Sequence, residues 1–472
     1  MTIKFFNTLT RKKEVFKPIK DKEVLMYNCG PTVYDRPHIG NMRSFVFADI
    51  LRRFLEFSGF KVKQVMNITD VDDKTIRDSG AEEVSLKEFA ERYTKIFFDY
   101  LDLLNIKRAS LYPRATENVK ETIEMARELV KKGYAYEMDG SVYFSIKKFK
   151  GYGKLSHLDM KNIKIGARIA ADEYEKDNPQ DFVLMKRSTT EELKRGIFYE
   201  TEWGNVRPGW HIECSVMVRK FLGDIIDIHT GGVDNMFPHH ENEIAQSEAF
   251  LGKKHVNYWL HCEHLLLNGE KMSKSLGNIV TLDDVIKKFS PEILRYMFAS
   301  VHWKKKLNYT NDFADNAKRN YEKLKETFDK LNFSLKSATS EKNEYDGTFV
   351  KKMKSIEKKF TEAMDNNLNT PLALKILHEF SKEMNKYLEE GRNKKTLEIA
   401  LKEFKKFSEV LGLKFKVSKE KLSGEVEKLI EERERARKSG EWEKADEIRN
   451  KLKDIGIVLE DTAEGIRWKK KI

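Results

Sequence analysis

The hydrophobic pattern of the first hundred residues alternates between stretches typical of strands and stretches typical of helices. An apolar run of strand length, Val24-Leu-Met-Tyr27, precedes residues 45–55, whose apolar positions recur at helical spacing. Residues 61–69 alternate as a strand does, and a helix is expected over about 86–104. This order predicts the first half of a doubly wound parallel sheet, which we assign to residues 1–105.

The pattern changes in the middle of the chain. Two alternating stretches flank Asp139-Gly140, which is a hairpin signal, and charged, Lys-rich sequence follows. We therefore expect an α+β insertion over 106–180. The apolar run at 181–185 is expected to rejoin the parallel sheet, so that residues 181–310 form its second half.

Beyond about Asn311 the apolar positions keep a helical period almost throughout. We expect a helical bundle over 311–413 and, after a charged linker, a small C-terminal domain over 414–472. The predicted fold class is α/β, with a doubly wound parallel, Rossmann-like sheet that carries an α+β insertion and is followed by the α-helical bundle and the small domain.

Composition narrows the class of partner and the compartment. The 472 residues carry a net charge of +12, which favours a polyanionic partner. Three cysteines are too few for a disulfide framework. No apolar run approaches the ~18 residues that span a membrane, and residues 1–6 lack the core of a signal peptide. A cytoplasmic protein with no membrane partner is expected.

Residues 31–41 form a turn between a predicted strand and a predicted helix. Nucleotides bind at the carboxyl ends of parallel strands, where helix N-termini offer amides to phosphate. His38 and Asn41 share one face of the first helical turn, so their donors could hold a phosphate. Gly40 marks a place where the backbone must approach another group. The alternative is an ordinary capped helix start with a satisfied histidine.

A second stretch with candidate chemistry is Lys271-Met-Ser-Lys-Ser275, which follows the turn signal Asn268-Gly269. Lys271 and Lys274 make a cationic loop suited to the charge on a transferring phosphate. Alone, such a loop is more often simply solvated. An earlier glycine turn, Thr230-Gly-Gly-Val-Asp234, also ends a buried strand, and its carboxylate suits ribose hydroxyls.

Sulfur, nitrogen and oxygen donors suggest a metal site. Cys29 ends the first strand, Cys214 lies in a predicted helix, and His239 and Glu243 share one helical face. Such a donor set fits Zn²⁺, although isolated cysteines usually behave as small buried hydrophobes. His240 and Glu241 remain alternatives to the named ligands. Cys262 is a competitor for Cys214, but nothing places it near Cys29, and we expect it to be a core residue.

Several of these motifs resemble a known family. His38-Ile-Gly-Asn41 and Lys271-Met-Ser-Lys-Ser275 resemble the two signatures of class I aminoacyl-tRNA synthetases. Residues 27–35, 67–74, 208–215 and 237–246 resemble segments of the cysteinyl-tRNA synthetases, and the similarity runs over nearly the full chain. Asn41 departs from the pattern, because many class I members have histidine there. Asparagine donates a hydrogen bond but cannot carry a charge.

The resemblance implies an ATP-dependent ligase. It would activate L-cysteine to cysteinyl-adenylate and transfer it to the 3′ end of tRNA(Cys), with Mg²⁺ accompanying ATP. The implied catalytic residues are His38, Asn41, Lys271 and Lys274. The implied ATP-binding residues are His38, Asn41, Gly232, Asp234 and Lys274. Thr69 and Trp210 would line the cysteine pocket, and a monomer is expected.

The resemblance also implies one Zn²⁺ per chain, held by Cys29, Cys214, His239 and Glu243, with the substrate thiolate as a further ligand. The physical reason is discrimination, since a shape-based pocket separates cysteine from serine by only ~1–3 kcal/mol. A soft thiolate binds zinc far better than a neutral hydroxyl does. Editing is then unnecessary.

Other functions share part of this pattern. A related ligase joins activated cysteine to an amino-sugar thiol precursor and needs no anticodon reader, but residues 425–472 argue against it. A nucleotidyltransferase would lack the lysine loop and the metal set, and a non-catalytic tRNA-binding protein would not need them. Trp442 and Trp468 could stack on unpaired anticodon bases or pack in an ordinary helical core.

Overall fold

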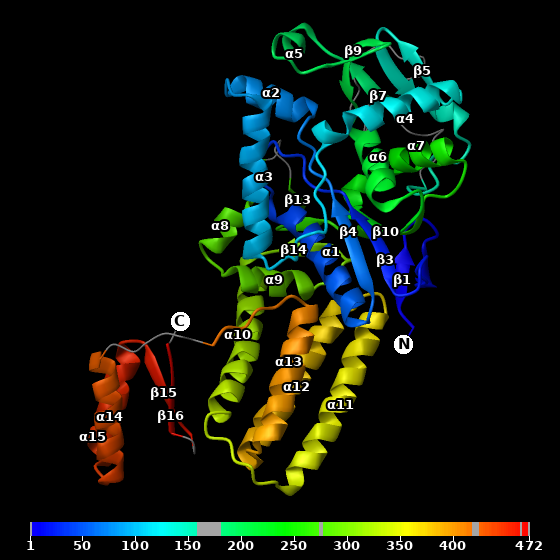
Figure 1. The fold of residues 1–472 in the computed structure, drawn as a ribbon. Helices are drawn as coiled ribbons and strands as arrows, with labels where there is room; N and C mark the ends of the chain where they lie inside the picture. The colour runs from blue at the N-terminus through cyan, green and yellow to red at the C-terminus, as the bar shows by residue number, and fades with distance from the viewer. Residues whose placement is uncertain (1, 158–180, 273–276, 418–423, 463–464, 471–472) are drawn as a thin grey trace. The chain divides into compact units, whose positions relative to one another are not determined.

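The computed structural model describes residues 2–157, 181–272, 277–417, 424–462 and 465–470. The chain divides into two compact units. Figure 1 shows its helices and strands, coloured by residue number. The first unit comprises Met1–Tyr321, Lys359–Lys375 and Ser408–Lys414, and the second comprises Glu322–Lys358, Ile376–Phe407 and Phe415–Ile472.

A four-stranded parallel sheet lies at the centre of the first unit, in the order β11-β10-β3-β4. Its strands are β3 (Glu23–Asn28), β4 (Lys61–Met66), β10 (Ile226–Gly232) and β11 (Val256–Cys262). Met26 and Tyr27 point to opposite faces and are both fully buried, so both faces are covered. The chain winds outward from β3 to β4 in one direction and from β10 to β11 in the other. This confirms the predicted doubly wound sheet, with its switch point between β3 and β10.

Helices cover this sheet and extend around it. The helix α1 packs against β4, β10 and β11, and α6 packs against β3 and β4. The helices of the first unit up to residue 310 are α1 (Ile39–Phe57), α2 (Asp73–Ala81), α3 (Leu86–Leu103), α4 (Val119–Lys131), α5 (Thr190–Lys194), α6 (Trp210–Leu222), α7 (Glu241–Leu251), α8 (Leu282–Ile286) and α9 (Pro291–Ala299). Short strands form two further sheets: β1 (Lys4–Asn7) with β2 (Lys12–Val15), and β12 (Leu265–Leu267) with β13 (Glu270–Lys271) and β14 (Leu307–Tyr309).

The insertion contains a five-stranded antiparallel sheet in the order β5-β6-β7-β9-β8. Its strands are β5 (Ala135–Met138), β6 (Ser141–Phe144), β7 (Phe182–Arg187), β8 (Tyr199–Thr201) and β9 (Gly204–Pro208). The predicted hairpin at Asp139-Gly140 is confirmed, because these two residues join β5 to β6 with positive φ angles.

The strand β7 corrects one expectation, since residues 181–185 do not rejoin the parallel sheet. Instead β7 pairs with β6 and β9, and the insertion's sheet continues to Pro208. The ring of Phe182 stacks on that of Phe144 at 5.0 Å, inside the insertion's own core. A short apolar run predicts a buried strand but does not tell which of two sheets buries it. Residues 158–180 lie outside the described part of the chain.

The region beyond Asn311 is helical as expected, except at its end. Its helices are α10 (Asn311–Ser334), α11 (Glu344–Asp365), α12 (Thr370–Glu390), α13 (Lys394–Val410), α14 (Gly424–Lys438) and α15 (Trp442–Asp454). They are followed by an antiparallel hairpin of β15 (Ile457–Thr462) and β16 (Gly465–Lys470), which departs from the helical expectation. None of the helices in the described ranges has the length and apolar character needed to cross a bilayer.

The segment from α14 to β16 has a small core of its own. Ile448, Leu452, Ile457 and Leu459 are buried there, and Trp468 packs against them. Trp442, at the start of α15, is 63% exposed. Of the two tryptophans considered for stacking, Trp468 is therefore a core residue of this segment, and Trp442 is the accessible one.

Candidate active site

A cavity of 410 Å³ lies at the carboxyl ends of β3 and β10, where the sheet changes winding direction. Its volume falls within the range usual for small-molecule sites. The predicted site residues that line it are Cys29, His38, Asn41, Thr69, Trp210, Cys214, Gly232, Asp234, His239 and Lys271. Lys274 lies outside the described residues.

The first turn of α1 is a capping box built from His38 and Asn41. The Asn41 amide donates to Nδ1 of His38 at 3.1 Å, and the His38 amide donates to Oδ1 of Asn41 at 3.1 Å. Burial lowers the pKa of His38, which favours the neutral ring. Since Nδ1 accepts, the proton of that ring is on Nε2. The cap and the phosphate-binding role are therefore compatible, because Nε2–H of His38 and the Nδ2 amide of Asn41 remain donors.

Gly40 brings the two predicted signature segments into contact. A Cβ at this position would lie 3.0 Å from the His38 ring and 3.0 Å from Cε of Met272. The predicted turn at Asn268-Gly269 joins β12 to β13, so that the β13 end of the hairpin leads into the lysine loop. Glycine at position 40 is thus explained by the close approach of Met272.

Asp234 links the end of β10 to this hairpin. Its Oδ1 lies 2.5 Å from Nζ of Lys271, and its Oδ2 lies 3.1 Å from Nδ1 of His264. Burial raises the pKa of Asp234, but the hydrogen bonds from His264 and Lys271 outweigh this effect and lower it to about 2. His264 was not predicted, and as a lone histidine after a strand it carries no signal in the sequence.

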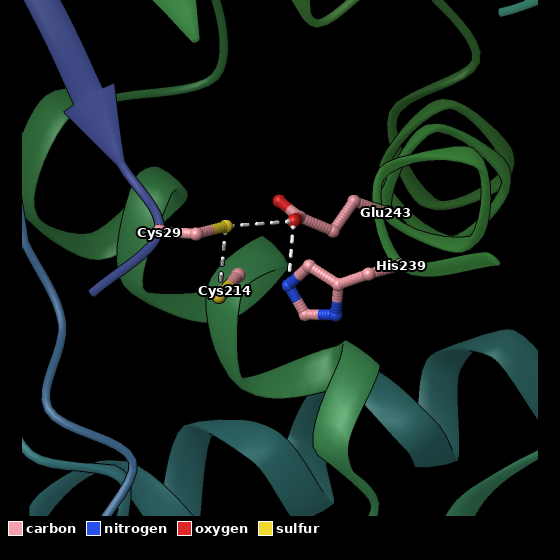
Figure 2. Close-up of side chains that lie close together, drawn as sticks. All are labelled: Cys29, Cys214, His239 and Glu243. Atoms are coloured by element: carbon pink, nitrogen blue, oxygen red, sulfur yellow. Dashed lines mark hydrogen bonds and ion pairs between the residues drawn. The ribbon is translucent and has the colours of Figure 1, made fainter. Parts of the chain in front are cut away.

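Four donor side chains converge beside the cavity (Figure 2). Cys29 follows β3, Cys214 lies on α6, His239 precedes α7, and Glu243 lies on α7. The Sγ atoms of Cys29 and Cys214 are 4.0 Å apart, and Oε1 of Glu243 lies 3.5 Å from Cys29 Sγ and 3.0 Å from Nε2 of His239. All four ligand atoms lie within 4.8 Å of one another, as one metal ion requires.

The electrostatics of this cluster call for a cation. Burial raises the pKa of the Cys29 thiol well above its usual value. The Cys29 hydrogen bond lowers the pKa of Cys214 to about 6. Burial lowers the pKa of His239, but the charges of Cys214 and Glu243 outweigh this and raise it to about 10. With Cys29 protonated, the buried Cys214 thiolate and Glu243 carboxylate both face the His239 imidazolium. A divalent metal in this place would supply two positive charges.

A second donor group shares two of these residues and consists of Cys29, His229, His240 and Glu243. Nε2 of His240 lies 3.1 Å from Cys29 Sγ, and its Nδ1 lies 2.7 Å from Nε2 of His261. Cys214 and His239, which belong only to the first group, line the cavity. His229 and His240, which belong only to the second group, do not line it. The first group is therefore the one that can present a metal to a ligand in the cavity.

The other two alternatives are accounted for by different contacts. The buried Glu241 carboxylate accepts hydrogen bonds from the amides of Gly153, Leu155 and Ser156, at 2.8 to 3.4 Å, which ties the insertion to the start of α7. Cys262 is buried at the end of β11, and burial raises its thiol pKa to about 11. Neither residue belongs to a donor group among the described residues.

Outer partners hold the donor side chains in place. Nε2 of His229 lies 2.9 Å from Oε2 of Glu243, leaving Oε1 directed at the cluster. Nδ1 of His239 lies 3.0 Å from Nδ1 of His211, and the His239 ring stacks on Trp210 at 4.5 Å. Such partners fix the orientation of metal ligands. His211 and His229 were missed in the sequence because neither has a spacing relation to the ligands.

Thr69, which also lines the cavity, is held by two hydrogen bonds. Its hydroxyl accepts from Nδ2 of Asn67 at 3.0 Å and donates to Oε2 of Glu213 at 3.2 Å. One lone pair of Oγ1 is thereby left for a donor in the cavity. Glu213 is buried, and burial raises its pKa well above the usual value.

Comparison with known families divides the chain into three matched segments. The family described as "tRNA synthetases class I (C) catalytic domain" matches residues 15–319. The "DALR domain" family matches residues 359–416, and the family described as "Cysteinyl-tRNA ligase anticodon binding domain" matches residues 419–468.

Individual relatives match this chain over nearly its whole length. A Methanosarcina acetivorans protein named cysteine–tRNA ligase is 53% identical over 468 residues, covering 99% of each chain. A Geobacillus thermodenitrificans protein of the same name is 45% identical over 470 residues, again covering 99% of each.

Two solved synthetase structures share the fold at low identity. The Mycobacterium tuberculosis methionyl-tRNA synthetase in complex with methionyl-adenylate matches with a TM-score of 0.57 and 15% identity, covering 82% of this chain and 89% of that one. The Agrobacterium radiobacter LeuRS–tRNA–LeuAMS complex matches with a TM-score of 0.60 and 10% identity, covering 84% and 85%.

Proposed function

Because this chain belongs to the cysteinyl-tRNA synthetases, ligases that join cysteine to tRNA, we propose that its 410 Å³ cavity carries out both steps of that reaction. The observation that carries the proposal is the convergence of Cys29, Cys214, His239 and Glu243 beside a cavity that His38 and Lys271 also line. A generic ATP-using ligase has no need of sulfur ligands at this place.

The metal is Zn²⁺, one per chain. Two sulfurs, one imidazole and one carboxylate match the donors that zinc takes. When bound, zinc favours the thiolate form of a sulfur ligand over a neutral hydroxyl, which separates cysteine from serine. Trp210, stacked on His239, walls the amino-acid pocket, and the Thr69 hydroxyl faces the substrate ammonium as an acceptor.

ATP binds with Mg²⁺ at the other end of the cavity. Nε2–H of His38 and the Asn41 amide donate to phosphate oxygens from the first turn of α1, where the helix dipole also favours an anion. The Gly232 backbone and the Asp234 carboxylate hold the adenosine. Lys271 and Lys274 neutralise the leaving pyrophosphate.

In the first step the cysteine carboxylate attacks the α-phosphorus, a new P–O bond forms, and the bond to pyrophosphate breaks. In the second step the 2′ or 3′ hydroxyl of the terminal adenosine attacks the acyl carbon, and AMP leaves. No protein nucleophile is needed, so catalysis rests on positioning and on stabilisation of phosphate charge. The neutral donors His38 and Asn41 act on the phosphate without carrying a charge of their own.

Binding of tRNA is assigned to the part of the chain beyond residue 310. Residues 311–413 form a tRNA-binding helical domain, and residues 414–472 read the anticodon, with exposed Trp442 available for base stacking. The net charge of +12 favours the same partner. We expect the enzyme to act as a monomer in the cytoplasm.

Cysteine-dependent exchange of pyrophosphate into ATP tests the proposal. The zinc-loaded protein should catalyse exchange with cysteine and not with serine, and should then acylate tRNA(Cys). Exchange without dependence on cysteine would instead indicate a nucleotidyltransferase. Exchange without tRNA acylation would indicate a ligase for another acceptor, such as an amino sugar.

A further inference from the structure

His264 and Lys271 both contact Asp234, the residue proposed to hold the adenosine of ATP. His264 lies between β11 and β12 and lines the cavity, and its side chain is 23% exposed to solvent. The backbone of Leu266, two residues further along, pairs with Lys271 on β13. His264 and Lys271 therefore reach the same carboxylate, Asp234, from one hairpin.

The two partners of Asp234 differ in how firmly they are held. Arg43, a buried residue of α1, donates from Nη1 to the carbonyl of Glu263 at 2.7 Å and to that of His264 at 2.6 Å. Its Nη2 donates to the carbonyl of Lys305 at 2.6 Å. The backbone of His264 is thereby tied to α1, the helix whose N-cap is His38.

Lys271 is attached far more loosely. Its side chain is 58% exposed, and its ammonium group sits on a flexible four-carbon stem. An ion pair between side chains this exposed contributes little to stability. Lys271 can thus leave Asp234 at small cost when a more strongly charged triphosphate enters, whereas His264 has no comparable freedom.

We propose that His264 is a positioning residue for ATP: it holds Asp234 in place through Nδ1–H while Lys271 moves from that carboxylate to phosphate. Oδ2 of Asp234 stays with His264, and Oδ1 is released to accept a ribose hydroxyl. The inference rests on the proposed function, since it assumes that the ribose lies at Asp234. It adds a residue that no sequence signature contains.

A matched pair of variants separates the hydrogen bond from the shape of the side chain. Leucine and asparagine have the same heavy-atom skeleton, and the asparagine amide nitrogen is as many bonds from Cα as Nδ1 of histidine. His264→Leu removes the donor, and His264→Asn retains it. Both are tested as full-length, zinc-loaded protein in cysteine-dependent pyrophosphate exchange, with KM measured for ATP and for cysteine.

We expect His264→Leu to raise KM for ATP about tenfold or more, as the loss of a hydrogen bond to a charged group does. KM for cysteine and zinc per chain should stay unchanged, and His264→Asn should behave nearly as the wild type. The wild type should use at least one of the two analogues 2′-deoxy-ATP and 3′-deoxy-ATP less well than ATP. His264→Leu should lose most of that discrimination.

Three results would overturn the inference while leaving the proposed function intact. The first is an unchanged KM for ATP in His264→Leu. The second is full discrimination against the deoxynucleotides in that variant. The third is a parallel loss of zinc and of affinity for cysteine, which would show a purely structural role. Absence of cysteine-dependent exchange in the wild type would instead remove the proposed function and the inference with it.

Discussion

Nε2 of His239 lies 3.0 Å from Oε1 of Glu243, while the other oxygen of this carboxylate is held by His229 at 2.9 Å. Both histidines are buried, so Glu243 is fixed from two sides before any metal binds. A carboxylate held in this way presents one oxygen to the cluster without having to be reoriented. The proposed ligand set is therefore preorganised, which lowers the cost of binding an ion.

The first prediction concerns the sulfur ligand on α6. Cys214→Ser should weaken zinc binding by more than the ~10–100-fold that follows loss of an outer partner, because a hydroxyl is a poor ligand for zinc. Cysteine-dependent exchange should fall with it, while ATP affinity should hold. Zinc per chain, measured by metal analysis after dialysis, checks the first effect, and equilibrium binding of ATP checks the last.

Cys262 supplies the matched control for this experiment. It is also a buried cysteine, but it belongs to neither donor group among the described residues. Cys262→Ser should retain zinc and cysteine-dependent exchange. Equal loss of zinc in the two variants, or unchanged exchange in Cys214→Ser, would contradict the assignment.

The second prediction concerns the protons released when zinc binds. At pH 7.5 the metal-free cluster carries a proton on Cys29, whose pKa burial raises, and one on His239, whose pKa lies at about 10. Cys214 carries no proton, because its pKa is about 6. Glu243 also carries none, because His229 and His239 hold its pKa low against the effect of burial. Both protonated groups must release their protons in order to bind. About two protons should therefore leave per zinc, and affinity should rise with pH.

Calorimetry in buffers of different ionisation enthalpy measures this number directly. Release of about two protons per zinc would support the group that contains Cys29 and His239, and release of none would contradict it. In the second donor group, burial holds the pKa of His240 well below its usual value, so this residue has no proton to release at pH 7.5.

The sequence was most informative where chemistry and spacing agreed. A strand-length apolar run followed by a turn and a helical period predicted β3 and α1, and the carboxyl ends of parallel strands predicted where Cys29 and Asp234 would lie. The ligand set needed the family resemblance as well, because His240 and Glu241 are equally good donors by type. Only the fold shows that the Glu241 carboxylate already accepts hydrogen bonds from the amides of Gly153, Leu155 and Ser156.

What the sequence could not predict depends on contacts between distant segments. His211, His229 and His264 act through residues 14 to 30 positions away, with no periodic relation to them. The sheet that receives β7 is decided by its packing on Phe144, not by its own hydrophobicity. The local hydrophobic pattern predicts which segments are buried, whereas tertiary packing decides which other segments they pack against.

The third prediction concerns stability. Asp49 on α1 is buried and accepts from Nε of Arg53 at 2.8 Å, from Nη2 of Arg295, and from the Lys107 amide at 2.9 Å. Asp49→Asn leaves the buried Arg295 guanidinium without its counter-charge. Breaking such a pair costs about 3–5 kcal/mol, and the urea midpoint of unfolding should fall accordingly.

An exposed pair provides the comparison. Asp99 lies 3.0 Å from Lys95 one turn away on α3, and both side chains are mostly exposed. Asp99→Asn should change the free energy of unfolding by only about 0.3–0.5 kcal/mol. Similar shifts for the two variants would mean that Asp49 does not compensate Arg295.

The last prediction distinguishes the two tryptophans of the C-terminal segment. Trp442 is 63% exposed, whereas Trp468 packs against the buried residues Ile448, Leu452 and Leu459. If Trp442 stacks on an unpaired anticodon base, Trp442→Ala should weaken tRNA binding by about 1–3 kcal/mol. Cysteine-dependent exchange, which needs no tRNA, should be unchanged, and so should the melting temperature.

Trp468→Ala should lower the thermal stability of this segment, because it removes part of a small core. Aminoacylation kinetics with KM for tRNA, measured beside exchange and thermal unfolding, therefore separate a contact with tRNA from a packing role. An unchanged KM for tRNA in Trp442→Ala would leave this exposed ring without a part in anticodon binding.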